Sequence, residues 1–210
     1  MINEVEHYEN IVRCLNEMIT NRNIESLQHI RYVQGYTGIL ATEYAKVYPK
    51  SRMTKEKIAW IVEAAGVHDI GKIMMPDILI SRVGRLSKAE TERMKEHTIK
   101  GYEMVKYLFD FREDDFCRIC QNVCLYHHEK YDGSGYPRGL KKDRIPIEAQ
   151  IVSVADMYEV MVHNERNDML FSKEKVYYML MNGECGELSP RMRECLESAK
   201  EQLEQLRIHM

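Results

Sequence analysis

The chain has 210 residues, 44% of them hydrophobic and 30% charged, which suits one large domain or a domain with a small extension. Its net charge is −3, from 30 basic and 33 acidic residues. No long nucleic acid is expected as a partner, because no basic surplus exists to displace phosphate counterions. We find no signal-peptide pattern and no run approaching the ~20 apolar residues of a membrane span. We therefore expect a cytoplasmic protein without a membrane partner, whose six cysteines are reduced.

The pattern of apolar residues is helical nearly throughout the chain. It begins with residues 2–18, and further helices are expected over residues 24–48, 54–66, 87–108, 115–128, 146–158 and 172–181, with a charged final helix from residue 189. No alternating strand pattern and no internal repeat is found. The sequence predicts an all-α fold, in which residues 1–22 form a helical extension and residues 23–210 form one helical bundle. The amphipathic extension also suggests a homodimer.

Residues that cap or break helices mark the limits of these segments. Pro49 ends the second helix, because the residue before a proline is disfavoured in a helix. Ser87 and Glu90 form a capping box, which starts a helix that would carry His97. Residues 132–137 are rich in glycine and must form a loop. Other candidate caps and first-turn prolines are Thr54, Pro146, Ser172 and the pair Ser189-Pro190.

Five of the eight histidines occur with carboxylates in a spaced series. Imidazole and carboxylate together favour Fe or Mn, and Zn is a further option. Eight candidate ligands are too many for one ordinary metal site, but they suit two or three metals that share carboxylates. Clustered metals generate hydroxide and clamp the oxygens of a displacement, which indicates a hydrolase of phosphate esters. The eight candidates are Glu25, His29, His68, Asp69, His97, His127, His128 and Asp156.

Glu25 and His29 are four residues apart, so on one helix they would share a face and reach one metal or two neighbouring metals. Alone, this spacing is more typical of an exposed acid–base pair.

The run from His68 to Lys72 is more informative. Asp69 offers two oxygens that can bridge two ions, and Lys72 can neutralise a phosphate oxygen or a leaving group. The alternative is a surface ion pair between Asp69 and Lys72.

His127 and His128 run directly into the glycine-rich loop. Neighbouring helical residues point about 100° apart, so both can reach the same centre only if it is wide or if the helix ends there. His97 and Asp156 are weak candidates alone, but each lies on a predicted helix, and helical bundles hold such metal sites in their interiors.

Cys117, Cys120 and Cys124 have a spacing that also suits a zinc site. No second pair follows at zinc-site spacing, and the three thiols match one helix face. We therefore assign these cysteines to the hydrophobic core.

Two motifs together resemble the HD-GYP family, a branch of the HD superfamily of metal-dependent phosphohydrolases. Residues 68–72, HDIGK, resemble its HD signature, and residues 127–137, HHEKYDGSGYP, resemble its HHExxDGxGYP signature without a gap. The similarity extends from about Glu25 to the final helix. It implies an HD-domain helical bundle with a multinuclear site of two or three Fe or Mn ions in its interior. It also implies hydrolysis of cyclic di-GMP to the linear dinucleotide or to GMP.

The resemblance assigns roles to individual residues. Asp69 and Lys72 would be catalytic, with Lys72 on the scissile phosphate, and Tyr136 of the GYP loop would lie near the substrate. Glu25 matches a carboxylate of the three-metal branch, and Glu159 takes the place of a usual substrate-site aspartate. The remaining implied metal ligands are His29, His68, His97, His127, His128 and Asp156, together with Asp69.

The stretch that usually holds the nucleotide is altered in this chain. Where the family has basic residues, this sequence has Glu165 and Asp168, and acids repel a dianionic nucleotide. Arg166 lies one position away and is our candidate for a substitute contact. Three hypotheses follow: a phosphodiesterase that hydrolyses cyclic di-GMP with a metal-bridged hydroxide, a phosphohydrolase of another nucleotide or phosphoester, and a signalling or binding module with weak turnover. We rank them in that order.

Overall fold

The computed structural model describes residues 4–82, 84–109, 114–163 and 171–208, and it gives side chains from Tyr8 onward. The described part is helical and contains no strand. Its helices are α1 (Glu4–Asn21), α2 (Leu27–Val47), α3 (Lys55–Ala65), α4 (Asp77–Ile80), α5 (Lys88–Lys95), α6 (His97–Leu108), α7 (Asp115–Tyr126), α8 (Ile147–His163), α9 (Lys173–Met181), α10 (Pro190–Ser198) and α11 (Lys200–Gln205), with 3₁₀ turns η1 (Pro49–Ser51), η2 (Ile70–Met74) and η3 (Lys142–Arg144). The predicted all-α fold is confirmed.

Side-chain caps begin most of these helices, as the sequence predicts. The hydroxyl of Thr54 accepts a hydrogen bond from the Lys57 N–H at the start of α3. Ser87 and Glu90 form the predicted capping box of α5. Ser172 and Ser189 cap α9 and α10, and Pro190 occupies the first turn of α10.

Two predicted boundaries are wrong, and both concern candidate ligands. The second helix begins at Leu27, because the Ser26 hydroxyl accepts the His29 N–H and caps it there, so Glu25 lies before the helix. The predicted helix over residues 87–108 is two helices, since α5 ends at Lys95 and α6 begins at His97. His97 is therefore the first residue of a new helix.

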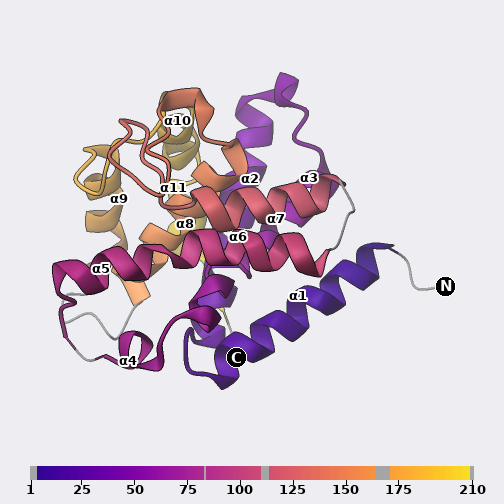
Figure 1. Cartoon of the computed structure of the whole chain (residues 1–210). Helices are drawn as coiled ribbons and strands as arrows, with labels where there is room; N and C mark the ends of the chain where they lie inside the picture. Colours follow the sequence, from indigo (N-terminus) through magenta and orange to yellow (C-terminus); the bar gives the residue numbers. More distant parts are fainter. Residues whose placement is uncertain (1–3, 83, 110–113, 164–170, 209–210) are drawn as a thin grey trace.

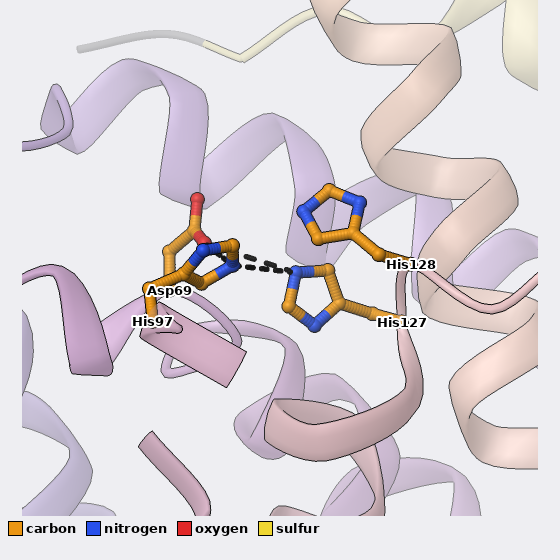
Figure 2. A group of neighbouring side chains, drawn as sticks. All are labelled: Asp69, His97, His127 and His128. Atoms are coloured by element: carbon orange, nitrogen blue, oxygen red, sulfur yellow. Dashed lines mark hydrogen bonds and ion pairs between the residues drawn. The ribbon is translucent and has the colours of Figure 1, made fainter. Parts of the chain in front are cut away.

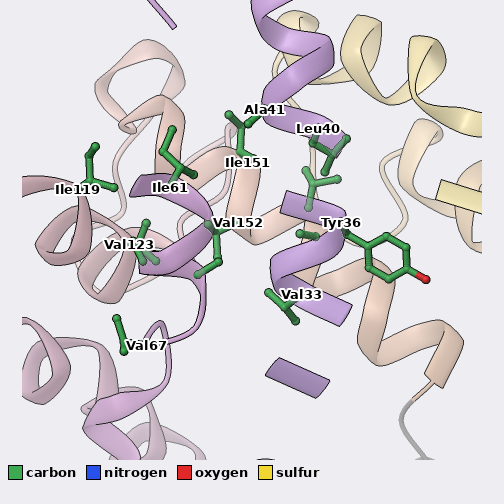
Figure 3. Packing of buried hydrophobic residues seen from close by; sticks show 14 of the residues in the cluster. Val33, Tyr36, Leu40, Ala41, Ile61, Val67, Ile119, Val123, Ile151 and Val152 are labelled. Carbon is green, nitrogen blue, oxygen red and sulfur yellow. The ribbon is translucent and has the colours of Figure 1, made fainter. Parts of the chain in front are cut away.

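α2 lies at the centre of the fold and packs against α3, α8 and α10, while α7 packs against α3, α6 and α8 (Figure 1). Apolar side chains from four of these helices meet in one core (Figure 3). Fully buried members of this core are Val33, Tyr36 and Leu40 of α2, Ile61 of α3, Val123 of α7, and Ile151 and Val152 of α8. The same core takes in the buried thiols of Cys117, Cys120 and Cys124, which agrees with their assignment to packing.

α1 lies across one end of this bundle and contributes to the same core. Tyr8, Val12, Leu15 and Ile19 are buried on its inner face. Its apolar face is thus used within the chain, and the amphipathic pattern by itself does not predict a dimer.

The division of the chain at residue 22 remains a prediction. Among the described residues, no helix has both the length and the apolar character of a membrane span.

Gly71 allows the turn that follows His68 and Asp69 to pack directly on α6. A Cβ atom at this position would lie 1.9 Å from the His97 carbonyl oxygen and 2.4 Å from the Gly101 nitrogen. Both neighbours are backbone atoms, so they cannot move aside as a side chain can. The close approach brings Asp69 to within reach of His97.

We predict that Gly71→Ala lowers the free energy of unfolding by about 3 kcal/mol, because the added methyl group forces the turn away from α6. Thermal or urea unfolding measures this change. Gly38→Ala, in the interior of α2, is the matched control. Its Cβ atom would lie 3.4 Å from a methyl group of Val62 in α3, which is ordinary contact, and alanine favours a helix over glycine by up to ~1 kcal/mol. Equal stability of the two variants would contradict the prediction.

Candidate metal centre

Seven of the eight candidate ligands form two adjacent groups in the interior. Within each group the possible ligand atoms all lie within 4.8 Å of one another. The first group contains Asp69, His97, His127 and His128, and the second contains His29, His68 and Asp156. Figure 2 shows Asp69 and His97 facing the His127-His128 pair across the first group.

The Asp69 carboxylate joins the two groups. Its Oδ1 atom lies 3.0 Å from His97 Nε2 and 3.7 Å from His127 Nε2, whereas its Oδ2 atom lies 3.3 Å from His68 Nε2. In the second group, Asp156 Oδ1 lies 3.7 Å from His29 Nε2 and 3.8 Å from His68 Nε2. Asp69 therefore has the position of a carboxylate that two metal ions can share.

Helix ends and turns bring these side chains together. His68 and Asp69 lie in the turn between α3 and η2, and His127 and His128 directly follow α7. The end of α7 lets two consecutive histidines face one centre, as the sequence predicts. His97 begins α6, while His29 of α2 and Asp156 of α8 come from helix interiors.

Four of the histidines have the Nδ1 atom fixed by a hydrogen-bond partner. Nδ1 lies 2.8 Å from the Ala65 carbonyl oxygen in His68, 2.7 Å from that of Met94 in His97, and 2.8 Å from that of Val123 in His127. In His29 it lies 2.6 Å from Glu159 Oε2. A proton on Nδ1 donates to these oxygens and leaves the Nε2 lone pair directed into the cluster, as in histidines that bind metals.

The residues present fit a metal. His29 Nε2, His68 Nε2 and Asp69 Oδ1 are buried and have no hydrogen-bond partner. Buried polar atoms are rarely left in this state, because each costs about 1–3 kcal/mol. A cation bound by nitrogen and oxygen ligands would satisfy all three atoms.

Burial and neighbouring charges shift the pKa values of the two groups in opposite directions. In the first group, burial and the adjacent imidazoles lower the pKa of His127 to about 3 and that of His128 well below its usual range, so both rings are neutral and able to bind a metal. In the second group, burial alone would lower the pKa of His68, but Asp69 outweighs it and raises this pKa to about 9. Burial opposes ionisation of Asp69, yet Lys72 and His68 hold its pKa well below the usual range.

Lys72 lies at the edge of the cluster between two carboxylates. Its Nζ atom is 2.5 Å from Asp69 Oδ2 and 2.6 Å from Glu25 Oε1. Glu25 Oε2 lies 3.8 Å from His29 Nε2, although Glu25 is outside α2. Glu25 thus reaches the site but belongs to neither ligand group, and its closest charged partner is Lys72.

The GYP loop covers His128. The Tyr136 ring stacks on the His128 ring with centroids 4.6 Å apart and planes 27° apart, and Lys95 Nζ lies 5.4 Å from the Tyr136 ring centroid. The buried Glu129 carboxylate accepts hydrogen bonds from the backbone N–H groups of Arg138 at 2.7 Å and Leu140 at 2.9 Å. Glu129 therefore holds the backbone of the loop in place through these two hydrogen bonds. We did not predict this role, although Glu129 directly follows the candidate ligand His128.

A pocket of about 310 Å³ opens beside the cluster. Its polar side is formed by Glu25, His29, Asp69, Lys72, His128 and Asp156, and its apolar side by Met157, Val160, Met161 and Cys185. The apolar side was missed by sequence reasoning. Met157, Val160 and Met161 follow Asp156 on α8 at helical spacing, which is a usable signal, whereas no signal connects Cys185 to the site.

The expected substrate contact of Glu159 stays a prediction, and the structure gives this side chain a different partner. Its side chain is 3% exposed, is not part of the pocket lining, and lies 2.6 Å from His29 Nδ1. Helical geometry accounts for this: at about 100° per residue, Met157, Val160 and Met161 lie on one side of Asp156 and line the pocket, whereas Glu159 lies on the other side, next to His29. Arg166, expected as a substrate contact, lies outside the described residues, as do Glu165 and Asp168.

The helical bundle and its clustered ligands are those of an HD domain, and comparison with known proteins agrees. The sequence profile of the HD domain family matches residues 13–171. The chain belongs to this family, and its motifs place it in the HD-GYP branch. A solved HDG"Y"P protein of Bdellovibrio bacteriovorus has the same fold, with a TM-score of 0.61 and 20% identity over 95% of this chain and 64% of that one.

Two characterised relatives carry the names of cyclic dinucleotide phosphodiesterases. The "Cyclic di-GMP phosphodiesterase" of Thermotoga maritima is 36% identical over 152 residues, which is 72% of this chain and 38% of that protein. The "3'3'-cGAMP-specific phosphodiesterase 2" of Vibrio cholerae is 26% identical over 196 residues, which is 93% of this chain and 35% of that protein. The chain thus spans little more than a third of the length of these relatives.

We predict that Asp69→Asn removes metal from both groups, because this carboxylate serves both, whereas Asp156→Asn lowers the metal content without abolishing it. Elemental analysis of metal per chain, on protein purified without oxygen, measures the difference. Asp77→Asn is the control and should retain the full content, because the Asp77 side chain is exposed at the start of α4. Full metal content in the Asp69→Asn variant would contradict the shared role.

We predict that Glu159→Gln weakens metal binding by roughly 10–100-fold, because it removes the charge that orients His29. Competition with a chelator measures the affinity. Glu148→Gln on the same helix is the matched control, since Glu148 is also buried but accepts its hydrogen bond from the Asn122 side chain. Equal affinities of the two variants would show that the Glu159 contact serves packing alone.

Proposed function

We propose that this chain is a metal-dependent phosphodiesterase that hydrolyses cyclic di-GMP. The observation that carries the proposal is the Asp69 carboxylate, shared by two ligand groups beside a pocket that also exposes Lys72. When bound, divalent ions lower the pKa of water and offset the charge of phosphate oxygens. Iron or manganese suits this set of imidazoles and carboxylates, and two or three ions are consistent with the number of ligands.

Lys72 provides a fixed positive charge in this scheme. Burial works against its charged form, but the Asp69 and Glu25 carboxylates outweigh burial and raise its pKa above the usual range. An ammonium group with a raised pKa stays protonated, so it acts through its charge and does not donate its proton in the reaction. It is placed to hold a phosphate oxygen as negative charge develops there.

The other pocket residues position the substrate. The imidazole of His128 is held by the Tyr136 ring, so the GYP loop limits where a phosphodiester can enter. Met157, Val160, Met161 and Cys185 offer an apolar surface for a nucleobase and exclude water from that side.

A second candidate is hydrolysis of another cyclic dinucleotide. Two features favour it: the acids Glu165 and Asp168 in the usual nucleotide-binding stretch, and a relative whose name specifies 3'3'-cGAMP.

The third hypothesis, a module with weak turnover, predicts that Asp69→Ala abolishes metal loading but leaves binding to a protein partner intact. The cytoplasmic location and the homodimer also stay predictions.

We expect protein loaded with Fe(II) or Mn(II) under anaerobic, reducing conditions to convert cyclic di-GMP to a linear product, as followed by chromatography. Lys72→Met should lower the rate by roughly 10²–10³-fold through loss of the fixed charge. Lys88→Met, on the exposed face of α5, is the control and should keep the full rate.

A parallel panel of 3',3'-cGAMP and cyclic di-AMP separates the candidates. Turnover confined to one of these would transfer the assignment to that substrate. No product from any of the three dinucleotides with either metal would overturn the proposed enzyme and leave the binding module.

A further inference from the structure

The turn between α9 and α10 supplies one part of the apolar wall of the pocket beside the metal groups. It covers residues 182–189, and its Cys185 lines the pocket together with Met157, Val160 and Met161 of α8. The three α8 residues are held by their helix, whereas Cys185 lies outside any helix. The position of Cys185 in the wall therefore depends on the contacts that hold the turn.

Lys130 reaches this turn from the segment that carries metal ligands. Its Nζ atom donates a hydrogen bond of 2.6 Å to the Cys185 carbonyl oxygen and lies 3.1 Å from Met157 Sδ. Lys130 is half-buried and does not itself line the pocket. One ammonium group thus contacts two members of the apolar wall, one on the turn and one on α8.

The backbone of the turn leaves room for the Lys130 side chain. Gly186 has a φ of 108°, and a Cβ atom there would lie 2.6 Å from Lys130 Cδ. The missing side chain lets the aliphatic stem of Lys130 lie directly against the turn. The Tyr131 N–H adds a hydrogen bond of 3.3 Å to the Glu187 carbonyl oxygen. Two consecutive residues therefore attach the turn to the segment that follows His128.

The charge of Lys130 makes this attachment strong. Hydrogen bonds from charged donors are shorter and roughly twice as strong as those between neutral groups. Withdrawing an ammonium group from water is unfavourable unless it is hydrogen-bonded, and the Cys185 carbonyl oxygen provides that bond. Lysine side chains are mostly exposed, so the partial burial of this one indicates a fixed position between the turn and α8.

We infer that Lys130 is a positioning residue for the substrate, which holds Cys185 in the pocket wall and so sets the surface on which a nucleobase lies. The inference rests on the proposed function and deepens it, because it assigns substrate affinity to a residue outside both ligand groups and outside the pocket lining. The nucleobase does not react, so its contacts contribute equally to the ground state and the transition state. Loss of such contacts raises KM and leaves kcat unchanged.

Steady-state kinetics of the Mn(II)-loaded full chain with cyclic di-GMP test this role. Lys130→Met keeps an aliphatic stem but removes the donor, and it should raise KM about tenfold while kcat stays within about twofold of the parent value. Lys130→Arg restores N–H donors and should recover most of the affinity. Lys88→Met, at an exposed position on α5, is the control and should match the parent. Metal content per chain should be the same in the parent and in all three variants.

Hydrogen–deuterium exchange reports the state of the turn without any turnover. The amides of Gly183, Glu184 and Gly186 donate to carbonyl oxygens of the turn and of α9. Lys130→Met should speed exchange in residues 183–187 severalfold, because a released turn opens more often. Exchange in α5 should stay at the parent rate, and Lys130→Arg should protect the turn as the parent does.

Three results would overturn the inference. These are an unchanged KM or unchanged exchange in the Lys130→Met variant, a joint loss of kcat and metal content, which would make Lys130 a support of the ligand segment, or no recovery in the Lys130→Arg variant. Absence of turnover in the parent would contradict the proposed function alone. The dissociation constant of cyclic di-GMP, measured by calorimetry, would then replace KM in the same comparison.

Discussion

The position of the Asp69 carboxylate is the constraint on which the site depends. One side chain serves imidazoles from both ligand groups and the Lys72 ammonium, with each oxygen facing a different set of partners. Four carboxylates, Asp69 with Glu25, Asp156 and Glu159, gather around a single lysine and the histidines. Such a concentration of buried negative charge is unfavourable unless cations are added, because buried charges need partners. The fold is therefore built around positive charge that the protein itself only partly supplies.

Local signals in the sequence predicted much of the fold and most of the cluster. Caps at Thr54, Ser87, Ser172 and Ser189 were found because one side chain and one backbone N–H three residues later are enough to define each. The convergence of His127 and His128 was predicted because the loop after His128 forces α7 to end, and consecutive histidines can face one centre at such an end. These interactions join residues close in the chain, which is the range that sequence patterns describe well.

The errors involve contacts between distant segments or competing caps. Ser26 starts α2 one residue after Glu25 and so excludes Glu25 from the helix, yet Glu25 still reaches Lys72, 47 residues away, through tertiary packing. The contact of Glu159 with His29, 130 residues earlier, was not predicted, because no pattern along the chain reports that pair. Cys185 enters the pocket wall from a turn far from both motifs. Side-chain direction and long-range packing decided each case.

Three consecutive residues after α7 support three different parts of the site, although only His128 lines the pocket itself. His128 belongs to a ligand group, Glu129 holds the backbone of the GYP loop, and Lys130 donates a hydrogen bond of 2.6 Å to the Cys185 carbonyl oxygen, behind the apolar wall. Gly135 packs directly on the backbone of this segment. An insertion or deletion of one residue here would change the direction of all three side chains at once. The His128 ligand position, the Glu129 contacts with the GYP loop and the Lys130 contact behind the apolar wall would then be lost together. A change of length would disturb these contacts least at the exposed residues 141–144, which follow the last N–H group that Glu129 holds, that of Leu140.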